Sequence, residues 1–557
     1  MGKTTRTLIQ LGSILPLSMA LISCGGGSGG GTSTEVVSLK GTVFASSVNG
    51  AEVTIENALG ERLAGPGTTG SDGSFTLALD KPHLADDLVI IARGGSYRDE
   101  ATGETKTAGE LSGHFAGGSL ADGSSASLTP GSSIVHRLVA AGMTRTAARA
   151  AFETASGYLP DSSVVPLDIT DADNSDGDLD RLKAGLRAGA FSQLAEDLGV
   201  NQFALITALT EDLADGTQDG QANGSPVTIG DSSIELPADI TARFARSLVK
   251  LFQSDRNLSG LDNNQIGQLP SPRTVITDNY RVSFSAGDDG SSMGKDEFQI
   301  TITDHDGNPA TMLNPTVHPH MNMSGGHGHA TAVGEVTNNG DGSYDAEIYY
   351  VMASVMSNGD SMGWWQLNVC LGNMTMHAMA TDMGHDGMDH GASTDCTGDV
   401  AAFYPSVAMA MGVKGVLKGG DSDQIPNMQT GGMMARNYHI FKDSIDQGDS
   451  SYHAHVYIAA TETMHNFPGL TEGLMLNEGM GHALMISSLL VEFSADDGAT
   501  WVTATNGHGG GMWAAEMAGT ADKLLVKLTI NDDIKTEDGL VGGINYVELT
   551  VSGDMAM

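Results

Sequence analysis

The sequence predicts a mainly β protein, built of several β-sandwich domains with a small helical domain in between. Glycine supplies 74 of the 557 residues, as expected when many short strands are joined by tight turns. Apolar and polar residues alternate over residues 36–92 and again from about 280 to the end, which is the pattern of half-buried strands. Between them, residues 130–260 change to helical spacing. At roughly 100–200 residues per domain, the length accommodates this arrangement.

The first 35 residues are typical of an export signal and a tether. Lys3 and Arg6 precede a short apolar run, which predicts a signal peptide over residues 1–23. The run ends in Leu-Ile-Ser-Cys24, which resembles the lipobox of bacterial lipoproteins. The resemblance implies that Cys24 is acylated and that residues 24–35 form a Gly/Ser-rich tether. It further implies an outer-membrane lipoprotein, facing the periplasm or the outside and attached to the membrane by its lipid only. An ordinary secretory signal is the alternative.

Residues 36–125 are expected to form the first β-sandwich. Short strands are predicted near 37–39, 51–55, 74–79 and 88–91, separated by turns such as Asn49-Gly50 and Asp72-Gly73. The pattern LKGTVFASSVNGAEVTIEN…TTGSDGSFTLAL is similar to carboxypeptidase-regulatory-like modules, which are transthyretin-type sandwiches. That resemblance implies an Ig-like or transthyretin-like spacer domain.

Residues 130–260 are expected to be a helical domain. Apolar residues such as Leu182, Leu186 and Leu194 recur on one face, which predicts helices near 179–198, 203–209 and 240–248. The acidic stretch from Asp171 to Asp178 lacks two features of a calcium-binding EF-hand. Asp176 stands where that loop needs glycine, and Leu182 stands where it needs glutamate. Capping of the following helix is the favoured interpretation, and calcium is the less favoured one.

Strand alternation then predicts two more β-sandwiches, over residues 280–420 and 430–553. The clearest strands lie at 281–284, 298–302, 346–350, 365–369, 455–458, 489–493 and 546–549.

Methionine and histidine are concentrated in this half of the chain. The last 265 residues hold 25 of the 28 methionines and 14 of the 17 histidines. Most lie in polar, Gly- and Asp-rich stretches, whereas core methionines should follow an apolar period. Met409 and Met411 are expected to be such core residues. The candidate metal ligands are His318, His320, Met321, Met323, His327 and His329 in the first cluster; Met374, Met376, His377, Met379, Met383, His385, Met388 and His390 in the second; and His453 and His455 on one face of a strand.

A looser third group surrounds that last pair. It comprises Met428, Met433, Met434, His439, Met464, His465, Met480, His482 and Met485.

Thioether and imidazole together indicate copper. Both are neutral ligands and thioether is soft, so methionine favours Cu(I) and histidine favours Cu(II). Zinc would use the histidines but leaves the methionines unexplained, and calcium or magnesium would need oxygen cages. A Met/His tract that buffers metal or absorbs oxidation is a further alternative.

The remaining cysteines, Cys370 and Cys396, flank the second cluster. In an exported chain a disulfide is the expected state. A pair of thiolate metal ligands is the alternative.

A second family resemblance covers residues 296–369. An Asp-x-x-Gly-x-Pro turn (Asp304 to Pro309), the Met/His segment, Gly342-Ser-Tyr344 and the strand around Trp364 follow in the order seen in YtkA-like (FixH-like) periplasmic domains. The resemblance implies a small β-sandwich associated with copper handling. It assigns Met321, Met323, His327 and His329 to the metal-binding segment of that family.

These features favour copper storage, resistance or delivery, with a copper-accepting or envelope protein as partner. The 68 acidic and 28 basic residues give a net charge of −40, which attracts cations and argues against nucleic acid. The sequence contains no GxSxG, HExxH or P-loop context, so no enzyme activity is expected and no residue is assigned a catalytic role. A structural or interaction lipoprotein, whose sandwiches serve as spacers, is the alternative.

Overall fold

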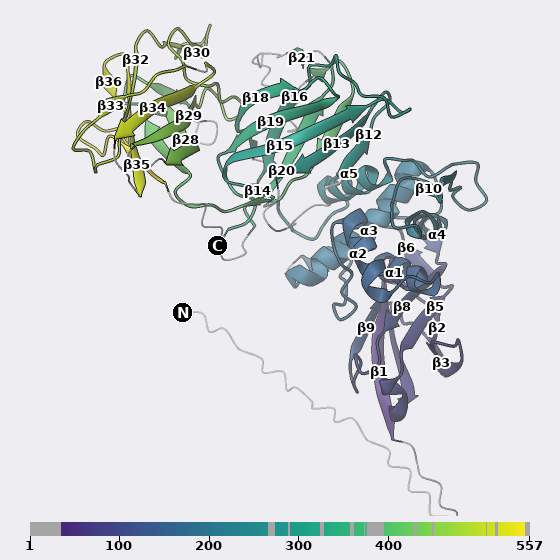
Figure 1. Cartoon of the computed structure of the whole chain (residues 1–557). Helices are drawn as coiled ribbons and strands as arrows, with labels where there is room; N and C mark the ends of the chain where they lie inside the picture. The colour runs from purple at the N-terminus through teal and green to yellow at the C-terminus, as the bar shows by residue number, and fades with distance from the viewer. Residues whose placement is uncertain are drawn as a thin grey trace, which may run out of the picture.

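The computed structural model describes residues 35–175, 177–263, 265, 273–287, 290–323, 328–356, 361–372, 374–375, 395–427, 432–447, 451–507, 509–518 and 522–551. The expected mainly β architecture is confirmed, with strands in separate sheets and helices grouped between the first and later strands (Figure 1). Cys24 and the predicted signal peptide lie outside the described residues. Within them, no helix has both the length and the apolar character needed to cross a membrane.

The first β-sandwich consists of two sheets. One has the order β4(Ser74–Asp80)–β1(Val36–Val43)–β9(Ser125–Leu128), and β1 runs parallel to β9. The other has the order β3(Arg62–Thr68)–β2(Glu52–Asn57)–β5(Leu88–Arg93)–β8(Glu110–Phe115). A ribbon of β6(Ser96–Arg98) and β7(Thr105–Thr107) lies beside them. Strict alternation along β4 buries Phe75, Leu77 and Leu79, as the sequence pattern predicts.

Five helices follow. They are α1(Pro130–Ala140), α2(Arg145–Ser156), α3(Leu179–Leu198), α4(Gln202–Leu213) and α5(Ile240–Gln253). The Asp178 carboxylate accepts a hydrogen bond from the Arg181 amide at 3.2 Å and caps α3, and Asp171 caps the short turn η2(Ala172–Asn174) in the same way. Both aspartates therefore have the capping role that the sequence favours. A small ribbon, β10(Gln221–Ala222) with β11(Ser225–Pro226), connects α4 to α5.

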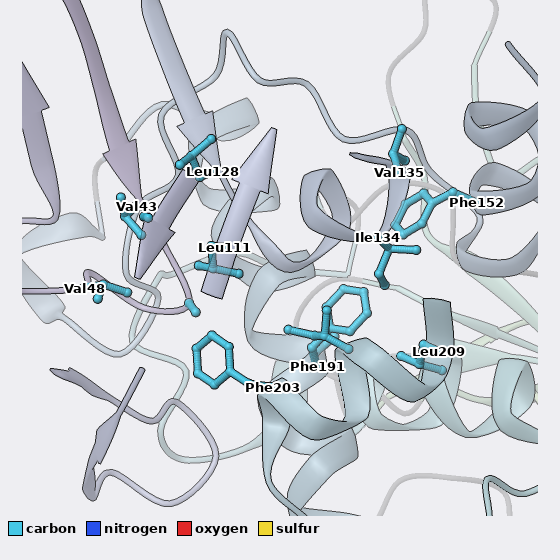
Figure 2. Close-up of a cluster of buried hydrophobic side chains, with 14 of the residues drawn as sticks. Val43, Val48, Leu111, Leu128, Ile134, Val135, Phe152, Phe191, Phe203 and Leu209 are labelled. Atoms are coloured by element: carbon cyan, nitrogen blue, oxygen red, sulfur yellow. The ribbon is translucent and has the colours of Figure 1, made fainter. Parts of the chain in front are cut away.

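The helices and the first sandwich share one continuous hydrophobic core. Leu111 and Leu128 of the sheets lie on one side of it, Phe191 and Leu209 of the helices on the other, and Phe203 between them (Figure 2). Burial of this joint surface stabilises both parts at once.

The third part is a β-sandwich built of a five-stranded and a four-stranded sheet. The five strands are β12(Thr274–Ile276), β13(Arg281–Ala286), β15(Gly294–Thr303), β19(Ser343–Tyr350) and β18(Ala332–Asn338), in that order. The four are β17(Gly328–His329), β16(Thr316–Asn322), β20(Trp364–Cys370) and β23(Val400–Phe403). Two short pairs, β14(Ser291–Ser292) with β24(Val407–Ala408) and β21(Met374–Thr375) with β22(Asp395–Cys396), complete it.

The fourth part is another β-sandwich of the same kind, and we call the sandwiches of the third and fourth parts the third and fourth sandwiches. One sheet has the order β25(Lys414–Lys418)–β28(Asn437–Gln447)–β29(Ser451–Ala460)–β34(Met512–Ala518). The other has the order β33(Val502–Thr503)–β32(Leu489–Ser494)–β35(Lys523–Ile530)–β36(Asp533–Ile534), and β37(Val547–Thr550) also pairs with β35. Two hairpins extend from it, β26(Gln424–Pro426) with β27(Met433–Ala435) and β30(Met475–Leu476) with β31(Leu484–Met485).

The third and fourth sandwiches lie side by side and are joined by their own small core (Figure 1). The Tyr349 and Tyr457 rings stack with centroids 4.1 Å apart. The Tyr349 hydroxyl donates to Asp443 at 2.7 Å, and the Lys295 ammonium lies 2.8 Å from the same carboxylate. These contacts fix the faces of β19 and β28 against one another, which is where the candidate site lies.

Candidate metal site between the C-terminal sandwiches

Strand alternation divides the first Met/His cluster between two faces of β16. Val317 and Met321 point into the hydrophobic core, and Met321 is fully buried there. Met321 was expected to be a metal ligand. In the structure it is a core residue, because the register that pairs it with Trp365 turns it inward. His318 and His320 occupy the alternate positions on β16.

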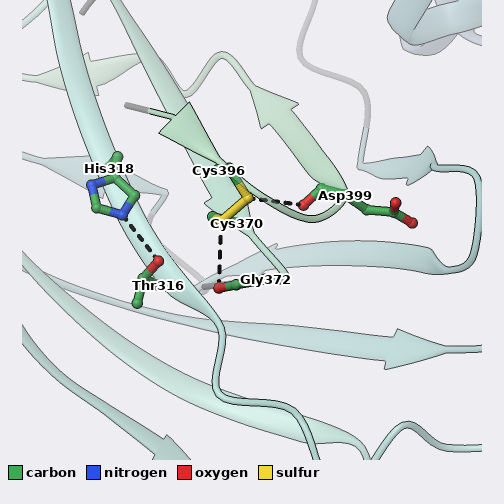
Figure 3. The surroundings of a disulfide bond; sticks show 6 residues. All are labelled: Thr316, His318, Cys370, Gly372, Cys396 and Asp399. Atoms are coloured by element: carbon green, nitrogen blue, oxygen red, sulfur yellow. Dashed lines mark hydrogen bonds between the residues drawn. A yellow bond between two sulfur atoms is a disulfide. The ribbon is translucent and has the colours of Figure 1, made fainter. Parts of the chain in front are cut away.

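His318 and His320 have different surroundings, although they are two residues apart. The His318 Nε2 atom lies 3.0 Å from the Thr316 hydroxyl, beside the Cys370–Cys396 disulfide (Figure 3). The two cysteines are thus joined in the structure, with their Cα atoms 5.9 Å apart. His320 instead stacks on His465 of the neighbouring sandwich, with ring centroids 5.5 Å apart and planes 25° from parallel.

His320 needs glycine beside it. A Cβ atom built on Gly328 would lie 2.5 Å from the His320 Nε2 atom, which is closer than real Cβ contacts come. Any larger residue at position 328 would therefore displace the His320 imidazole or the backbone of β16 at Met321.

Two further histidines, one from each sandwich, belong to the same group. His329, on β17, lies edge-on to Trp365 at 5.4 Å, and its Nδ1–H donates to the Ala330 carbonyl at 2.8 Å. That bond fixes the tautomer and leaves the lone pair on Nε2. His439, on β28, contacts the Thr461 hydroxyl through Nε2 at 3.0 Å. We refer to His320, His329, His439 and His465 as the interdomain histidines.

Three of the interdomain histidines hold a buried ring nitrogen that has no hydrogen-bond partner in the part of the chain that the structure describes. These atoms are Nδ1 of His320, Nε2 of His329 and Nδ1 of His439. Their side chains are largely enclosed, with residue exposures of 9%, 5% and 8%. Leaving a polar atom unpaired in the interior costs on the order of 1–3 kcal/mol, so each of these atoms calls for a partner. For His329, whose Nδ1 carries the proton, that partner has to be an electrophile that accepts the Nε2 lone pair.

Burial keeps these imidazoles neutral. Desolvation lowers the pKa of His320 to about 4 and that of His439 to about 3, and neighbouring cationic groups add to the effect. Desolvation likewise lowers the pKa of His329 and of His465. A neutral imidazole offers a lone pair, which is the form that binds a transition metal.

Lys414 places a cation near the group. Its ammonium donates to the Val351 carbonyl at 2.5 Å, and burial lowers the pKa of Lys414 to about 8. The charge of Lys414 in turn lowers the pKa of His329 and of His439.

The interdomain histidines form a chain of neighbours and not a closed coordination shell. Among the described residues, no three His, Cys, Asp or Glu side chains are placed to hold a metal ion together. Met464 precedes His465 in the chain, and its backbone carbonyl accepts the Ala330 amide at 2.8 Å, next to His329. Met464 is 39% exposed and His465 is exposed as well, so this end of the group is in contact with solvent.

The other predicted ligands lie elsewhere. Met323 is half-buried at the end of β16. His453 and His455 share the outer face of β29, as the spacing of two predicts, and His453 lies 3.7 Å from Glu516. His327, Met376, His377, Met379, Met383, His385, Met388 and His390 lie outside the described residues, as does the side chain of Met374. Met411, expected in a core, is 62% exposed.

Sequence reasoning placed His439 and His465 only in the loose third group and did not select them as ligands. His439 lies between the buried residues Tyr438 and Ile440 on β28, so it faces away from the core of its own sandwich. The alternation of apolar residues around His439 could therefore have predicted that its side chain faces out of its own sandwich. Nothing in the sequence indicated Lys414.

Comparisons with known proteins do not identify a family or a function for this chain. No protein family and no curated protein matches the sequence. Among solved structures, the adhesin InvE of Yersinia pseudotuberculosis matches over 49% of this chain and 60% of its own chain, at 13% identity and a TM-score of 0.15. The chain therefore spans less than two thirds of that protein, and a match at this level supports no statement about fold or function.

Proposed function

We propose that the protein is a lipid-anchored envelope protein that binds copper for storage, resistance or delivery. The observation that carries the proposal is the set of three buried histidines, His320, His329 and His439, each of which has a ring nitrogen without a hydrogen-bond partner among the described residues. His465, which is exposed, stacks on His320 beside them. The Met/His segment between Cys370 and Cys396 would supply further ligands. Anchoring through Cys24 would place the protein at the outer membrane, where a copper-accepting or envelope protein would be its partner.

The chemistry of the donors supports copper over other cations. Imidazole nitrogen and thioether sulfur suit Cu(I) and Cu(II), whereas calcium and magnesium require oxygen. Met464 beside His465 adds a soft donor that zinc does not need. The net charge of −40 raises the local concentration of any cation. Binding would require small rotations of the imidazoles, because their present positions do not form a shell.

A structural or interaction lipoprotein is the second candidate. It is favoured by Met321, which belongs to a hydrophobic core, and by the apolar contacts that join the two C-terminal sandwiches. In that case the interdomain histidines would be packing groups of the joint.

Cu(I) retention by the mature protein tests the proposal. We expect the anaerobically loaded protein to retain copper against a chelator of known affinity, and the double variant His320→Gln/His465→Gln to lose at least one equivalent. The matched control is His83→Gln, which replaces a partly exposed histidine of the first sandwich. A variant in which Met374, Met376, His377, Met379 and His385 are all replaced measures how much of the retained copper the second cluster binds.

Circular dichroism and the melting temperature establish that each variant is folded. The interdomain site is supported if the double variant loses copper and His83→Gln does not. A wild-type protein that retains no copper, or a double variant that retains as much as the wild type, contradicts it.

A further inference from the structure

The β30–β31 hairpin of the fourth sandwich gathers thioethers on an exposed surface. Met475 and Met485 are directly opposite one another in its register, which places their Cβ atoms about 4.5–5.5 Å apart on one face. The adjacent pair, Leu476 and Leu484, packs into the core of the sandwich. Alternation therefore turns both methionines outward, and Met485 is 44% exposed.

The loop of the same hairpin adds two more donors. Met480 is 43% exposed, and His482 follows two residues later. The hairpin thus carries three thioethers and one imidazole within 11 residues. Met480 and Met485 are exposed and Met475 is partly buried, so packing in the core does not account for this set.

Asn477 fixes the hairpin to the turn that reaches the interdomain histidines. Its backbone adopts a positive φ of 50°, and its side-chain amide donates to the Glu462 carbonyl at 2.9 Å. Its side-chain oxygen accepts from the buried Arg436 guanidinium at 2.8 Å. The Asn477 amide also lies 3.7 Å from the Met480 sulfur. Two residues after Glu462 comes Met464, and then His465, which stacks on His320.

We propose that this hairpin is a Cu(I)-docking site, formed by the thioethers of Met475, Met480 and Met485, which passes the ion through Met464 and His465 to the interdomain histidines. The transfer step rests on the proposed function, because it assumes that the interdomain histidines bind copper. Thioethers bind the soft monovalent ion and discriminate against Zn²⁺ and Ca²⁺. Because the ligands are neutral and exposed, the ion exchanges readily. Movement to imidazole involves no change of oxidation state.

The direct test is a methyl NMR titration of the mature protein carrying ¹³C-methyl methionine. Ag(I) serves as a probe of the same charge and softness that does not undergo oxidation. We expect the methyl signals of Met475, Met480 and Met485 to shift at stoichiometric Ag(I), whereas that of Met312, which is 90% exposed on another domain, stays in place. Unchanged signals from the three hairpin methionines would overturn the docking site.

A kinetic test addresses the transfer. The variant Met475→Leu/Met480→Leu/Met485→Leu keeps the apolar volume and removes the sulfur atoms. We expect it to load the interdomain histidines at least fivefold more slowly from a Cu(I)–chelator complex, with unchanged final retention. Met312→Leu/Met411→Leu, which removes two exposed thioethers elsewhere, is the control and should load at the wild-type rate.

Different results would contradict the hairpin transfer route and the proposed copper site. Equal loading rates in the triple variant and the control would overturn the transfer route even if the copper site stands. A hairpin that binds Ag(I) in a protein whose histidines retain no copper would instead contradict the proposed function and leave the docking site in place.

Discussion

Lys414 sets an electrostatic limit on any cation bound by the interdomain histidines. Its ammonium is held by the Val351 carbonyl, and its charge already lowers the pKa of His329 and His439. A bound copper ion would experience the same repulsion, in a region where burial weakens solvent screening. A copper site at this position would therefore not reach the tightest possible binding, which would suit the proposed role in storage or delivery.

Replacing Lys414 by leucine should strengthen copper binding, because the change removes the charge without adding a sulfur ligand. We expect Lys414→Leu to bind Cu(I) about tenfold more tightly at pH 7, equivalent to about 1.4 kcal/mol. Burial lowers the pKa of Lys414 to about 8, so the wild-type affinity should rise between pH 7 and pH 9 as the ammonium loses its proton. The variant should lack that rise. Lys418→Leu, on the same strand, is the control, and chelator competition at both pH values is the measurement. Equal or weaker binding by Lys414→Leu would contradict the electrostatic limit.

The sequence could place residues whose position depends on local strand periodicity, and it could not place those that depend on register or on long-range contacts. His453 and His455 were predicted on one face because strand periodicity is local. Met321 was predicted as a ligand from composition, whereas the strand register places its side chain in the hydrophobic core. The stacking of His320 on His465 joins positions 145 residues apart in two different sandwiches. No local pattern contains that information.

At the level of elements, regular periodicity was the reliable guide. The apolar period predicted α3 at 179–198, where the structure has Leu179–Leu198. α1 was not predicted, because its buried face includes Ser132 and Ser133. Their hydroxyls bond the backbone of Ser112 on β8, at 2.8 Å from Ser132 and 2.9 Å from Ser133. A buried serine whose hydroxyl is hydrogen-bonded to a neighbouring strand does not contribute to the apolar period from which a helix is predicted.

The Cys370–Cys396 disulfide closes a loop between β20 and β23, and its loss should destabilise the third sandwich. With 26 residues of separation, the chain-entropy estimate is about 3.5 kcal/mol. We expect Cys370→Ser/Cys396→Ser to lower the free energy of unfolding by about that amount in urea titrations under non-reducing conditions. A double variant that keeps its stability but loses one copper equivalent would instead favour the thiolate-ligand interpretation.

For the whole molecule, the distribution of the cores suggests two cooperative parts. The first sandwich and the helices share one core, which Trp364 and Tyr404 of the third sandwich adjoin. The third and fourth sandwiches have their own cores and meet through Tyr349, Tyr457 and the interdomain histidines. A ligand that bridges the second contact stabilises the C-terminal pair without affecting the N-terminal part.

Differential scanning calorimetry of the copper-loaded protein should therefore show a selective effect. Free copper at 100 times its dissociation constant adds about 2.7 kcal/mol to the folded state that binds it. We expect the transition of the C-terminal pair to rise by a few degrees, roughly in line with that energy for domains of this size, and the other transition to stay unchanged. His320→Gln/His465→Gln should abolish the rise. If both transitions shift together, copper binds the acidic surface non-specifically, because only a bridging site discriminates between the two parts of the chain.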